Sequence, residues 1–388
     1  MANLLCPYCF SHFAGKEMAF RCANPTGSCP QEPDVEMGRF LGLAPMPAPK
    51  TFIPPAGFLD VRARRSATCS CGYETRLKVC PNCHNEWPAS LESTDNLILA
   101  IIGAREVGKS QYIAVLINEL THNFGVRFNA SLNAVDDRTR SRYATDFRRY
   151  VYDEKAVVPA TLVPRPYPLI YRLTFEEGTF YKSLRVVTLV FFDTAGENFT
   201  TTSKLNAHNR YMANASGILF LLDPLQIPAV QGRLPNLRRF PQERTSPIDV
   251  ISRTDEVIRN VLDLDVRKKI QIPVALAFSK LDAVRPILPT GSIAYRDSRH
   301  EGHFDLSDFE QMNETMRSHV ANWVGGGLEQ LLRQRFSDYA YFGISALGGA
   351  PDDQGRIPGG VAPFRVEDPF LWLLYRLNVI SGRKRKSA

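Results

Sequence analysis

The residues best suited to chemistry lie in one short run, Gly103-Ala104-Arg105-Glu106-Val107-Gly108-Lys109-Ser110, which fits the spacing G-x-x-x-x-G-K-S completely. Glycines let the backbone bend so that successive N–H groups point at phosphate oxygens, beside the positive end of the next helix. Lys109 adds charge against the terminal phosphates and is assigned a catalytic role, while the Ser110 hydroxyl ligates Mg²⁺. The predicted nucleotide-binding residues of this loop are Gly103, Glu106, Val107, Gly108, Lys109, Ser110 and Gln111.

A second motif, Asp193-Thr194-Ala195-Gly196-Glu197, ends the apolar run Val186–Phe192. We expect Asp193 to help hold Mg²⁺, and we expect Gly196 to bring its N–H close to a γ-phosphate without a side-chain clash. Asp and Gly also favour ordinary turns at strand ends. The phosphate loop upstream makes a site the better interpretation.

Short apolar runs that alternate with longer helical patterns predict an α/β fold with a mostly parallel sheet. The first helix should open near Gly108, with Ile113, Leu116, Ile117 and Leu120 on one apolar stripe. The last helix should start at Asp368-Pro369, with Asp368 as its N-cap. The predicted strands are Asn96–Ile102, Leu169–Phe175, Arg185–Phe192, Gly217–Leu222, Pro273–Phe278 and Tyr339–Ile344.

Two later strand ends carry motifs that bear on the choice of base, Ser279-Lys280-Leu281-Asp282 and Ile344-Ser345-Ala346-Leu347. Together with Asp193-Thr194-Ala195-Gly196 they resemble the [N/T]-K-x-D, S-A-[K/L] and D-x-x-G elements of GTPases of the translation-factor and Ras-like class. The resemblance covers about residues 95–380. It implies a P-loop GTPase three-layer sandwich that binds GTP or GDP with Mg²⁺.

In such proteins Asp282 would accept two hydrogen bonds from guanine, from N1–H and from the N2 amino group. Lys280 would lie along the base and the phosphate loop, and Ser345, Ala346 and Leu347 would place a backbone N–H at guanine O6. Ser279 stands where the family has Asn or Thr, which weakens one orienting hydrogen bond. An ATPase with the same phosphate site therefore stays open as an alternative.

The switch threonine, which senses the γ-phosphate and Mg²⁺, should lie between the first helix and the strand Leu169–Phe175. Thr161 is the candidate, because Thr139 and Thr145 fall in a helix-like, arginine-rich stretch. Glu197 stands where many Ras-like members have a water-orienting glutamine, so we expect slow turnover or help from a partner's arginine. The resulting catalytic set is Lys109, Thr161 and Glu197, and the Mg²⁺ set is Ser110, Thr161 and Asp193.

All eight cysteines precede residue 84 and include two C-P-x-C knuckles. Four thiolates complete a closed tetrahedral zinc site, so eight predict about two structural Zn²⁺ ions. The pairing stays open between a sequential grouping, first four and last four, and an interleaved one; His12 and His84 are bystanders. The predicted ligands are Cys6, Cys9, Cys22, Cys29, Cys69, Cys71, Cys80 and Cys83.

The domain organisation follows from composition. Residues 1–90 form the cysteine-rich module, in which the proline-rich insertion 31–61 should be an extended loop; residues 95–380 form the GTPase domain, and 381–388 a basic tail. The N-terminus lacks the pattern of a signal peptide, and no apolar run is long enough to span a bilayer. We therefore expect a cytoplasmic protein with reduced thiols.

The net charge of +7 permits nucleic-acid binding but does not require it. Arg62, Arg64, Arg65, Arg76 and Lys78 could serve a nucleic-acid-associated factor, although the module lacks a run of stacking aromatics. A cysteine-rich ribbon joined to Asp193–Glu197 also resembles the bacterial double-GTPase proteins. That resemblance implies a regulatory GTP switch with a protein partner, such as another GTPase or an activating protein.

Overall fold

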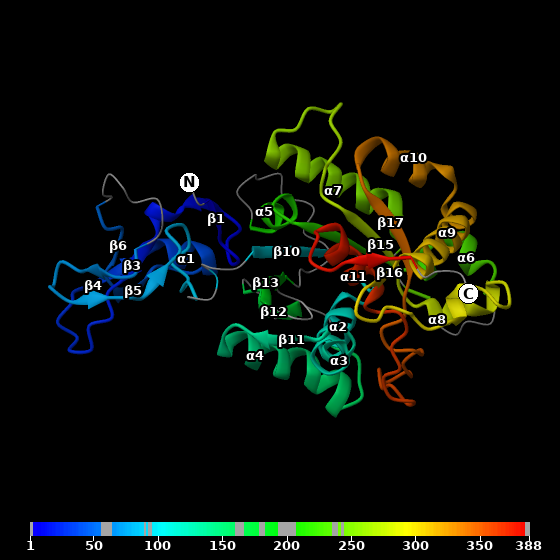
Figure 1. Cartoon of the computed structure of the whole chain (residues 1–388), viewed down its shortest axis with the longest axis horizontal. Coiled ribbons are helices and arrows are strands. Elements are labelled where there is room, and N and C mark those ends of the chain that lie inside the picture. Colours follow the sequence, from blue (N-terminus) through cyan, green and yellow to red (C-terminus); the bar gives the residue numbers. More distant parts are fainter. Residues whose placement is uncertain are drawn as a thin grey trace. The chain divides into compact units, whose positions relative to one another are not determined.

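The computed structural model describes residues 3–55, 64–88, 91, 95–159, 167–177, 183–192, 207–234, 240–241 and 244–384. The chain divides into two compact units (Figure 1). Unit 1 is Met1–Asn96 with Pro166–Pro168, and unit 2 is Leu97–Arg165 with Leu169–Ala388. In the described part of the chain, none of the helices combines the length and the apolar character that crossing a bilayer requires.

Unit 2 is built on a seven-stranded sheet with the order β11-β12-β13-β10-β14-β15-β17. All six predicted strands are confirmed. The strands are β10 (Asp95–Ile102), β11 (Ala130–Ala134), β12 (Leu169–Glu177), β13 (Ser183–Phe191), β14 (Gly217–Leu222), β15 (Val274–Phe278) and β17 (Tyr339–Gly343). β11 was not predicted, because this edge strand reads Ala-Ser-Leu-Asn-Ala and buries only Leu132 among its side chains. Two short strands, β16 (Phe304–Asp305) and β18 (Gly382–Arg383), pair separately, so the expected basic tail, 381–388, includes a short strand.

The parallel half of this sheet determines where a ligand can bind. β10, β14, β15 and β17 run parallel, with Ile102 beside Phe220, Leu222 beside Phe278, and Phe278 beside Gly343. The residues that follow these strands therefore emerge at one edge. In open α/β sheets, ligands bind outside the carboxyl ends of the strands.

The helices of unit 2 surround the sheet (Figure 1). They are α2 (Lys109–His122), α3 (Phe124–Phe128), α4 (Asp137–Tyr143), a π-helix (Ala144–Asp153), α5 (Ala207–Ala213), α6 (Pro228–Gln231), α7 (Pro247–Leu262), α8 (Leu281–Val284), α9 (Leu306–Val324), α10 (Gly326–Arg335) and α11 (Asp368–Arg376). Short 3-10 turns at Pro224–Gln226, Arg285–Ile287 and Ile293–Tyr295 connect them.

Two helix starts can be compared with the sequence. α2 begins directly after Gly108, as predicted, and buries its apolar stripe. It also buries Tyr112 and Val115. The Tyr143 hydroxyl donates to Ala114 O at 2.9 Å, which fastens the α4 and π-helix segment to α2. α11 does begin at Asp368, but its N-cap is Glu367, so the predicted capping role of Asp368 is wrong.

Unit 1 is a set of short hairpins. Its strands are β1 (Asn3–Leu5), β2 (His12–Ala14), β3 (Ala19–Arg21), β4 (Gln31–Asp34), β5 (Met46–Pro49), β6 (Thr51–Phe52), β7 (Ala67–Thr68), β8 (Glu74–Thr75) and β9 (Lys78–Val79). β1 pairs with β2, β4 with β5 and β7 with β8, while β3 lies between β6 and β9. The aromatic ring of Tyr167 belongs to this unit and packs edge-on against Phe40, with ring centroids 5.4 Å apart.

The proline-rich insertion is not the extended loop that its composition predicted. β4, α1 (Val35–Leu41), β5 and β6 lie within it. The Asp34 carboxylate caps α1 by accepting from Met37 N at 2.9 Å, and Gly42 ends the helix at φ 69°. The Asp34 carboxylate also forms a hydrogen bond with Nδ1 of the His84 ring, at 2.6 Å. One capping residue thus gives this segment its structure and fastens it to the second cysteine knuckle.

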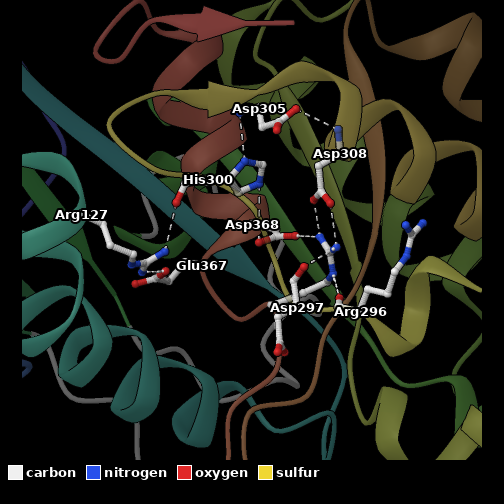
Figure 2. A network of polar contacts seen from close by, with 9 residues as sticks. Arg127, Arg296, Asp297, His300, Asp305, Asp308, Glu367 and Asp368 are labelled. Carbon is white, nitrogen blue, oxygen red and sulfur yellow. Dashed lines mark hydrogen bonds and ion pairs between the residues drawn. The ribbon is translucent and has the colours of Figure 1, made fainter. Parts of the chain in front are cut away.

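A buried ion-pair network holds together the C-terminal part of unit 2 (Figure 2). The Arg365 guanidinium lies 2.6 Å and 3.0 Å from the two Asp308 oxygens and 2.7 Å from Asp368 Oδ2. Asp308 is in the first turn of α9, and Asp368 is the first residue of α11. Buried carboxylates are tolerated when paired in this way. Arg365 therefore fastens the starts of two helices to each other.

The network continues to α3. Arg127 pairs with Glu367 and donates to the carbonyl of His300 at 3.4 Å. Burial raises the pKa of Glu367, and burial lowers the pKa of His300, because desolvation disfavours each charged form. His300 is therefore a neutral ring near pH 7.

His300, Asp308 and Asp368 lie close enough together to ligate a metal ion, but their chemistry does not fit one. The backbone N–H of Asp305 donates to His300 Nδ1 at 3.0 Å. The neutral ring must then carry its proton on Nε2, which faces Asp368 Oδ1 at 3.6 Å. No lone pair is left for a metal, and Arg365 already occupies the space between the carboxylates.

We predict that Arg365→Met destabilises unit 2 by about 3–5 kcal/mol, because it leaves two buried carboxylates unpaired. The matched control is Arg376→Met, at the other end of α11, where the ion pair with Asp338 is partly exposed. The control should cost at most about 1 kcal/mol. Urea unfolding measures both, and equal midpoints for the two variants would show that the network is not important for stability.

Candidate functional site

The phosphate loop lies between the end of β10 and the start of α2. At Gly103 an added Cβ would lie 2.4 Å from Leu221 O and 2.8 Å from the Val107 side chain, so no larger residue fits. At Gly108 the surroundings are open, but φ is +91°, a conformation that favours glycine. The two glycines are therefore required for different reasons, close backbone approach and left-handed geometry.

The side chain of Lys109 extends back toward the first residues of this loop. Its ammonium donates to Gly103 O at 2.9 Å and to Ala104 O at 3.0 Å, and the residue is 8% exposed. Both acceptors belong to the start of the loop. The charge thus lies where phosphates would meet the α2 N-terminus.

Three successive carbonyls on the outer side of the loop each receive a side-chain donor. Gln226 Nε2 donates to Arg105 O at 2.9 Å, and Lys280 Nζ donates to Glu106 O at 3.0 Å. The Ser279 hydroxyl lies 3.0 Å from Val107 O. These donors come from the chain after β14 and β15, at the same edge of the sheet. They keep the carbonyls on the outside of the turn.

Ser279 stands where the resembling GTPases have Asn or Thr, a change expected to weaken one orienting hydrogen bond. The serine nevertheless contacts the phosphate loop. Its hydroxyl lies within donating distance of Val107 O and, at 3.2 Å, of Leu222 O, and the residue is buried. Lys280 adopts φ +53°, which turns its side chain to the loop and leaves Asp282 in the first turn of α8. A serine is long enough here because the two backbones approach closely.

The base motifs meet at the next strand end. The Ser345 hydroxyl donates to Asp282 Oδ1 at 2.5 Å and accepts from Gly348 N at 3.0 Å. Ser345 is buried, while Asp282, Ala346 and Leu347 are half-buried. Two segments 63 residues apart in sequence are therefore brought together, with the carboxylate orientation fixed by the serine.

The loop after Ser345 also reaches the segment that precedes Thr161. Val157 N donates to Gly355 O at 2.9 Å, and Ile357 N donates to Lys155 O at 2.7 Å. Gln111 Nε2 donates to Val158 O at 3.2 Å, which anchors the same segment beside Ser110. The chain leading to the expected switch threonine is thus hydrogen-bonded to both ends of the site.

Thr161, Asp193, Gly196 and Glu197 lie outside the described residues, so their predicted roles stay predictions. The other two threonines have partners of their own. Thr139 is buried and accepts from Ile170 N at 3.2 Å. The Thr145 hydroxyl donates to Ser141 O at 3.0 Å. Each of these two side chains is thus bonded to the backbone of unit 2.

Sequence reasoning missed Asp223 and Gln226. Both are 3% exposed and follow β14, and Asp223 Oδ2 lies 2.5 Å from Lys280 Nζ. Burial raises the pKa of Asp223, and the neighbouring Lys280 ammonium opposes that rise. Its position in the sequence could have indicated Asp223, because an acidic residue directly after a buried parallel strand lies at the edge of the sheet where ligands bind.

The cysteines form two groups of four, in the interleaved pairing. Cys6, Cys9, Cys80 and Cys83 form the first, and Cys22, Cys29, Cys69 and Cys71 form the second. In the first group the Sγ atoms of Cys6 and Cys83 lie 3.8 Å apart, and in the second those of Cys22 and Cys71 lie 3.6 Å apart. A tetrahedral ion with Zn–S bonds of about 2.3 Å requires about 3.8 Å between sulfurs. Both groups are therefore compatible with zinc.

The two knuckles of the first group share one backbone geometry. Phe10 N donates to Cys6 O at 3.0 Å, and His84 N donates to Cys80 O at 2.9 Å. Phe10 and His84 both have positive φ, at 57° and 53°. Among the residues that the structure describes, neither group of four cysteines includes His12 or His84.

Comparison with known proteins agrees with this geometry. The model of the Double-GTPase 2 family matches residues 97–347, about two thirds of the chain. The chain belongs to the Double-GTPase 2 family. The matched range begins in β10 and ends at Leu347, so it contains both the phosphate loop and the base motifs. The cysteine groups lie outside it.

One relative is similar over most of both chains. It is the "Putative ESX-1 scaffolding and assembly protein SaeC" of Mycolicibacterium smegmatis (strain ATCC 700084 / mc(2)155). It is 28% identical over 324 residues, which cover 78% of this chain and 81% of the relative. The double-GTPase family assignment supports nucleotide binding by unit 2, and the relative's title concerns scaffolding and assembly.

Proposed function

We propose that this protein is a Mg²⁺-dependent GTPase that acts as a slow regulatory switch through a protein partner. The main support is a pair of hydrogen bonds that connect the phosphate loop with the two base motifs. Lys280 donates to Glu106 O in the phosphate loop, and Ser345 donates to Asp282. A nucleotide bound along this edge would meet Lys109 at its phosphates and Asp282 at its base.

The choice of guanine rests on hydrogen-bond chemistry. A carboxylate only accepts, so Asp282 complements the N1–H and N2 amino group of guanine. Adenine has no donor at these positions and would leave the carboxylate unpaired. Sites built to hydrogen-bond one ligand strongly reject analogues that lack the partner group. An ATPase is the weaker alternative, because Ser279 retains the contact with the phosphate loop.

For hydrolysis we assign Mg²⁺ to Ser110, Thr161 and Asp193, whose oxygens are the ligands that this ion prefers. When bound, Mg²⁺ supplies charge against the phosphate oxygens. Lys109 adds a second charge there, and Gly196 offers a backbone N–H. Glu197 would hold the attacking water but repels the γ-phosphate, so turnover should be slow unless a partner contributes an arginine.

Two features favour a protein partner over nucleic acid. The arginine-rich segment 137–154 pairs its charges internally, as Arg148 does with Asp153 at 3.0 Å and Arg149 with Glu154 at 2.7 Å. In the cysteine module, Lys78 is buried. The similar protein SaeC carries a title that speaks of scaffolding and assembly. We infer a comparable scaffolding role here, exercised in the cytoplasm with a protein partner such as another GTPase or an activating protein.

We further propose that each cysteine group holds one Zn²⁺ ion in a closed, structural site. Asn82 N donates to Cys80 Sγ at 3.4 Å, and Asn85 Nδ2 donates to Cys83 Sγ at 3.3 Å. Such donors stabilise thiolates, the form that binds metal. The hairpins of unit 1 are short, so metal binding should supply much of their folding free energy.

Lys109→Ala should abolish tight GTP binding while leaving the fold intact, because the core around the loop comes from β10 and α2. Isothermal titration with GTP and Mg²⁺ measures the affinity, and thermal melting measures the fold. The control is Lys269→Ala, an exposed lysine far along the chain. An affinity equal to that of the control would remove the phosphate-site assignment.

Asp282→Asn should weaken GTP binding by about tenfold or more, since an unmatched buried polar group costs about 1–3 kcal/mol. Affinity for xanthosine triphosphate should rise, because asparagine donates to the oxygen that replaces the guanine amino group. Competition binding measures both, with Asp263→Asn as the control outside the site. An unchanged ratio between the two nucleotides would contradict the assigned role of Asp282.

Purified protein should contain about two zinc ions per chain, from eight thiolates at four per ion. The interleaved pairing gives a sharper test through two double variants. Cys6→Ser with Cys80→Ser damages one group and should leave about one zinc, whereas Cys6→Ser with Cys69→Ser damages both and should leave about none. Elemental analysis decides, and equal zinc in the two variants would contradict independent groups.

A further inference from the structure

The turn that follows β14 belongs to neither base motif, yet it contacts the phosphate loop. It consists of Asp223 and the 3-10 turn Pro224–Gln226. β14 lies between β10 and β15, so its end emerges between the phosphate loop and Lys280. Both polar side chains of the turn are almost completely buried, which is costly unless each has a defined partner.

Asp223 uses its two oxygens differently. Oδ1 accepts from Leu225 N at 2.8 Å, which holds the turn itself. Oδ2 pairs with the Lys280 ammonium at 2.5 Å, and that ammonium also donates to Glu106 O at 3.0 Å. The carboxylate therefore fixes the position of the lysine against the loop. The side chain of Asp223 is fully buried and that of Lys280 about one third exposed.

Gln226 acts directly on the loop. Its amide Nε2 donates to Arg105 O at 2.9 Å, one residue before the carbonyl that Lys280 contacts. A peptide group whose carbonyl is held outward presents its N–H on the opposite side. Successive N–H groups that point inward make an anion-binding concavity. Gln226 and Lys280 thus orient two adjacent peptide groups of the loop.

We propose that the turn Asp223–Gln226 positions the phosphate loop for the nucleotide phosphates: Gln226 holds the Arg105 peptide, and Asp223 holds Lys280 on the Glu106 peptide. The proposal rests on the nucleotide-binding function proposed above. Neither residue need touch the base. Their effect should therefore fall on the affinity for every nucleotide and not on the choice of base.

The test uses Gln226→Met, which keeps the side-chain volume but removes the donor. The control is Gln271→Met, because Gln271 makes the same kind of bond, Nε2 to Lys269 O at 3.1 Å, between residues outside both the turn and the phosphate loop. Titrations with GDP, GTP and xanthosine triphosphate should show a loss of about 3- to 10-fold for Gln226→Met, equal for all three, as expected for one hydrogen bond. The control should lose less than about twofold.

Asp223→Asn gives an independent reading, because asparagine keeps the bond to Leu225 N and removes the charge facing Lys280. Combined with Lys280→Met, it should add little further loss, since both variants break the same contact. Thermal melting of each variant separates unfolding from a change in affinity. Equal nucleotide affinities for Gln226→Met and Gln271→Met, in folded proteins, would overturn the proposal.

The same titrations separate this inference from the proposed function. A wild-type protein that prefers ATP would end the guanine assignment, while the Gln226→Met loss, measured with ATP, would still support the positioning role. A wild-type protein that binds GTP with no loss in Gln226→Met or Asp223→Asn would end the positioning role alone. Failure of the folded wild-type protein to bind any of these nucleotides would contradict both.

Discussion

A loop that binds phosphate through its backbone must turn its N–H groups inward, and its carbonyls then need donors from outside. Here three successive carbonyls, those of Arg105, Glu106 and Val107, are each contacted by a buried or half-buried side chain. The donors come from two neighbouring parallel strands, so the sheet order directly determines the shape of the loop. The rest of unit 2 depends on this constraint, because the strand ends must stay in register for the donors to reach.

The C-terminal part of unit 2 holds the second half of the candidate site, the base motifs, in position. Ser345 orients Asp282, and the chain after it returns through Phe364, which pairs with Ser345 through two backbone hydrogen bonds. The next residue is Arg365, the centre of the buried ion-pair network. The loop after β17 is therefore held at one end by the contact of Ser345 with Asp282 and, about twenty residues later, by the buried ion pairs of Arg365.

Much of this architecture could be predicted from the sequence. Apolar runs located six strands because buried parallel strands are continuously apolar, and the phosphate loop and base motifs have distinctive spacing. β11 was not predicted, because a half-polar edge strand has no continuous apolar run. The helix α1 was not predicted because the prolines on both sides of it outweighed Asp34 and Gly42, which cap it. Composition describes the average of a segment, whereas capping depends on single residues.

Contacts between distant residues were the part that the sequence could not supply. The two C-P-x-C knuckles have the same spacing, so the sequence could not distinguish the sequential from the interleaved cysteine pairing. The hairpins of unit 1 place Cys6 beside Cys83, which the sequence does not show. Asp223 and Gln226 resembled an ordinary Asp-Pro turn, since the acceptor Arg105 O lies 121 residues away in sequence from Gln226. Likewise, the contact of Ser279 with Val107 O depends on backbone approach, which no motif encodes.

The measurement that tests the central claim most directly is the affinity of the intact chain for GTP and for ATP, by isothermal titration with Mg²⁺. Asp282 should make the difference large, because adenine leaves its carboxylate unpaired and sites built to hydrogen-bond one ligand reject such analogues by factors of about 10⁴. We predict tight binding of GTP and GDP with little or no binding of ATP. Equal affinities, or a preference for ATP, would contradict the account.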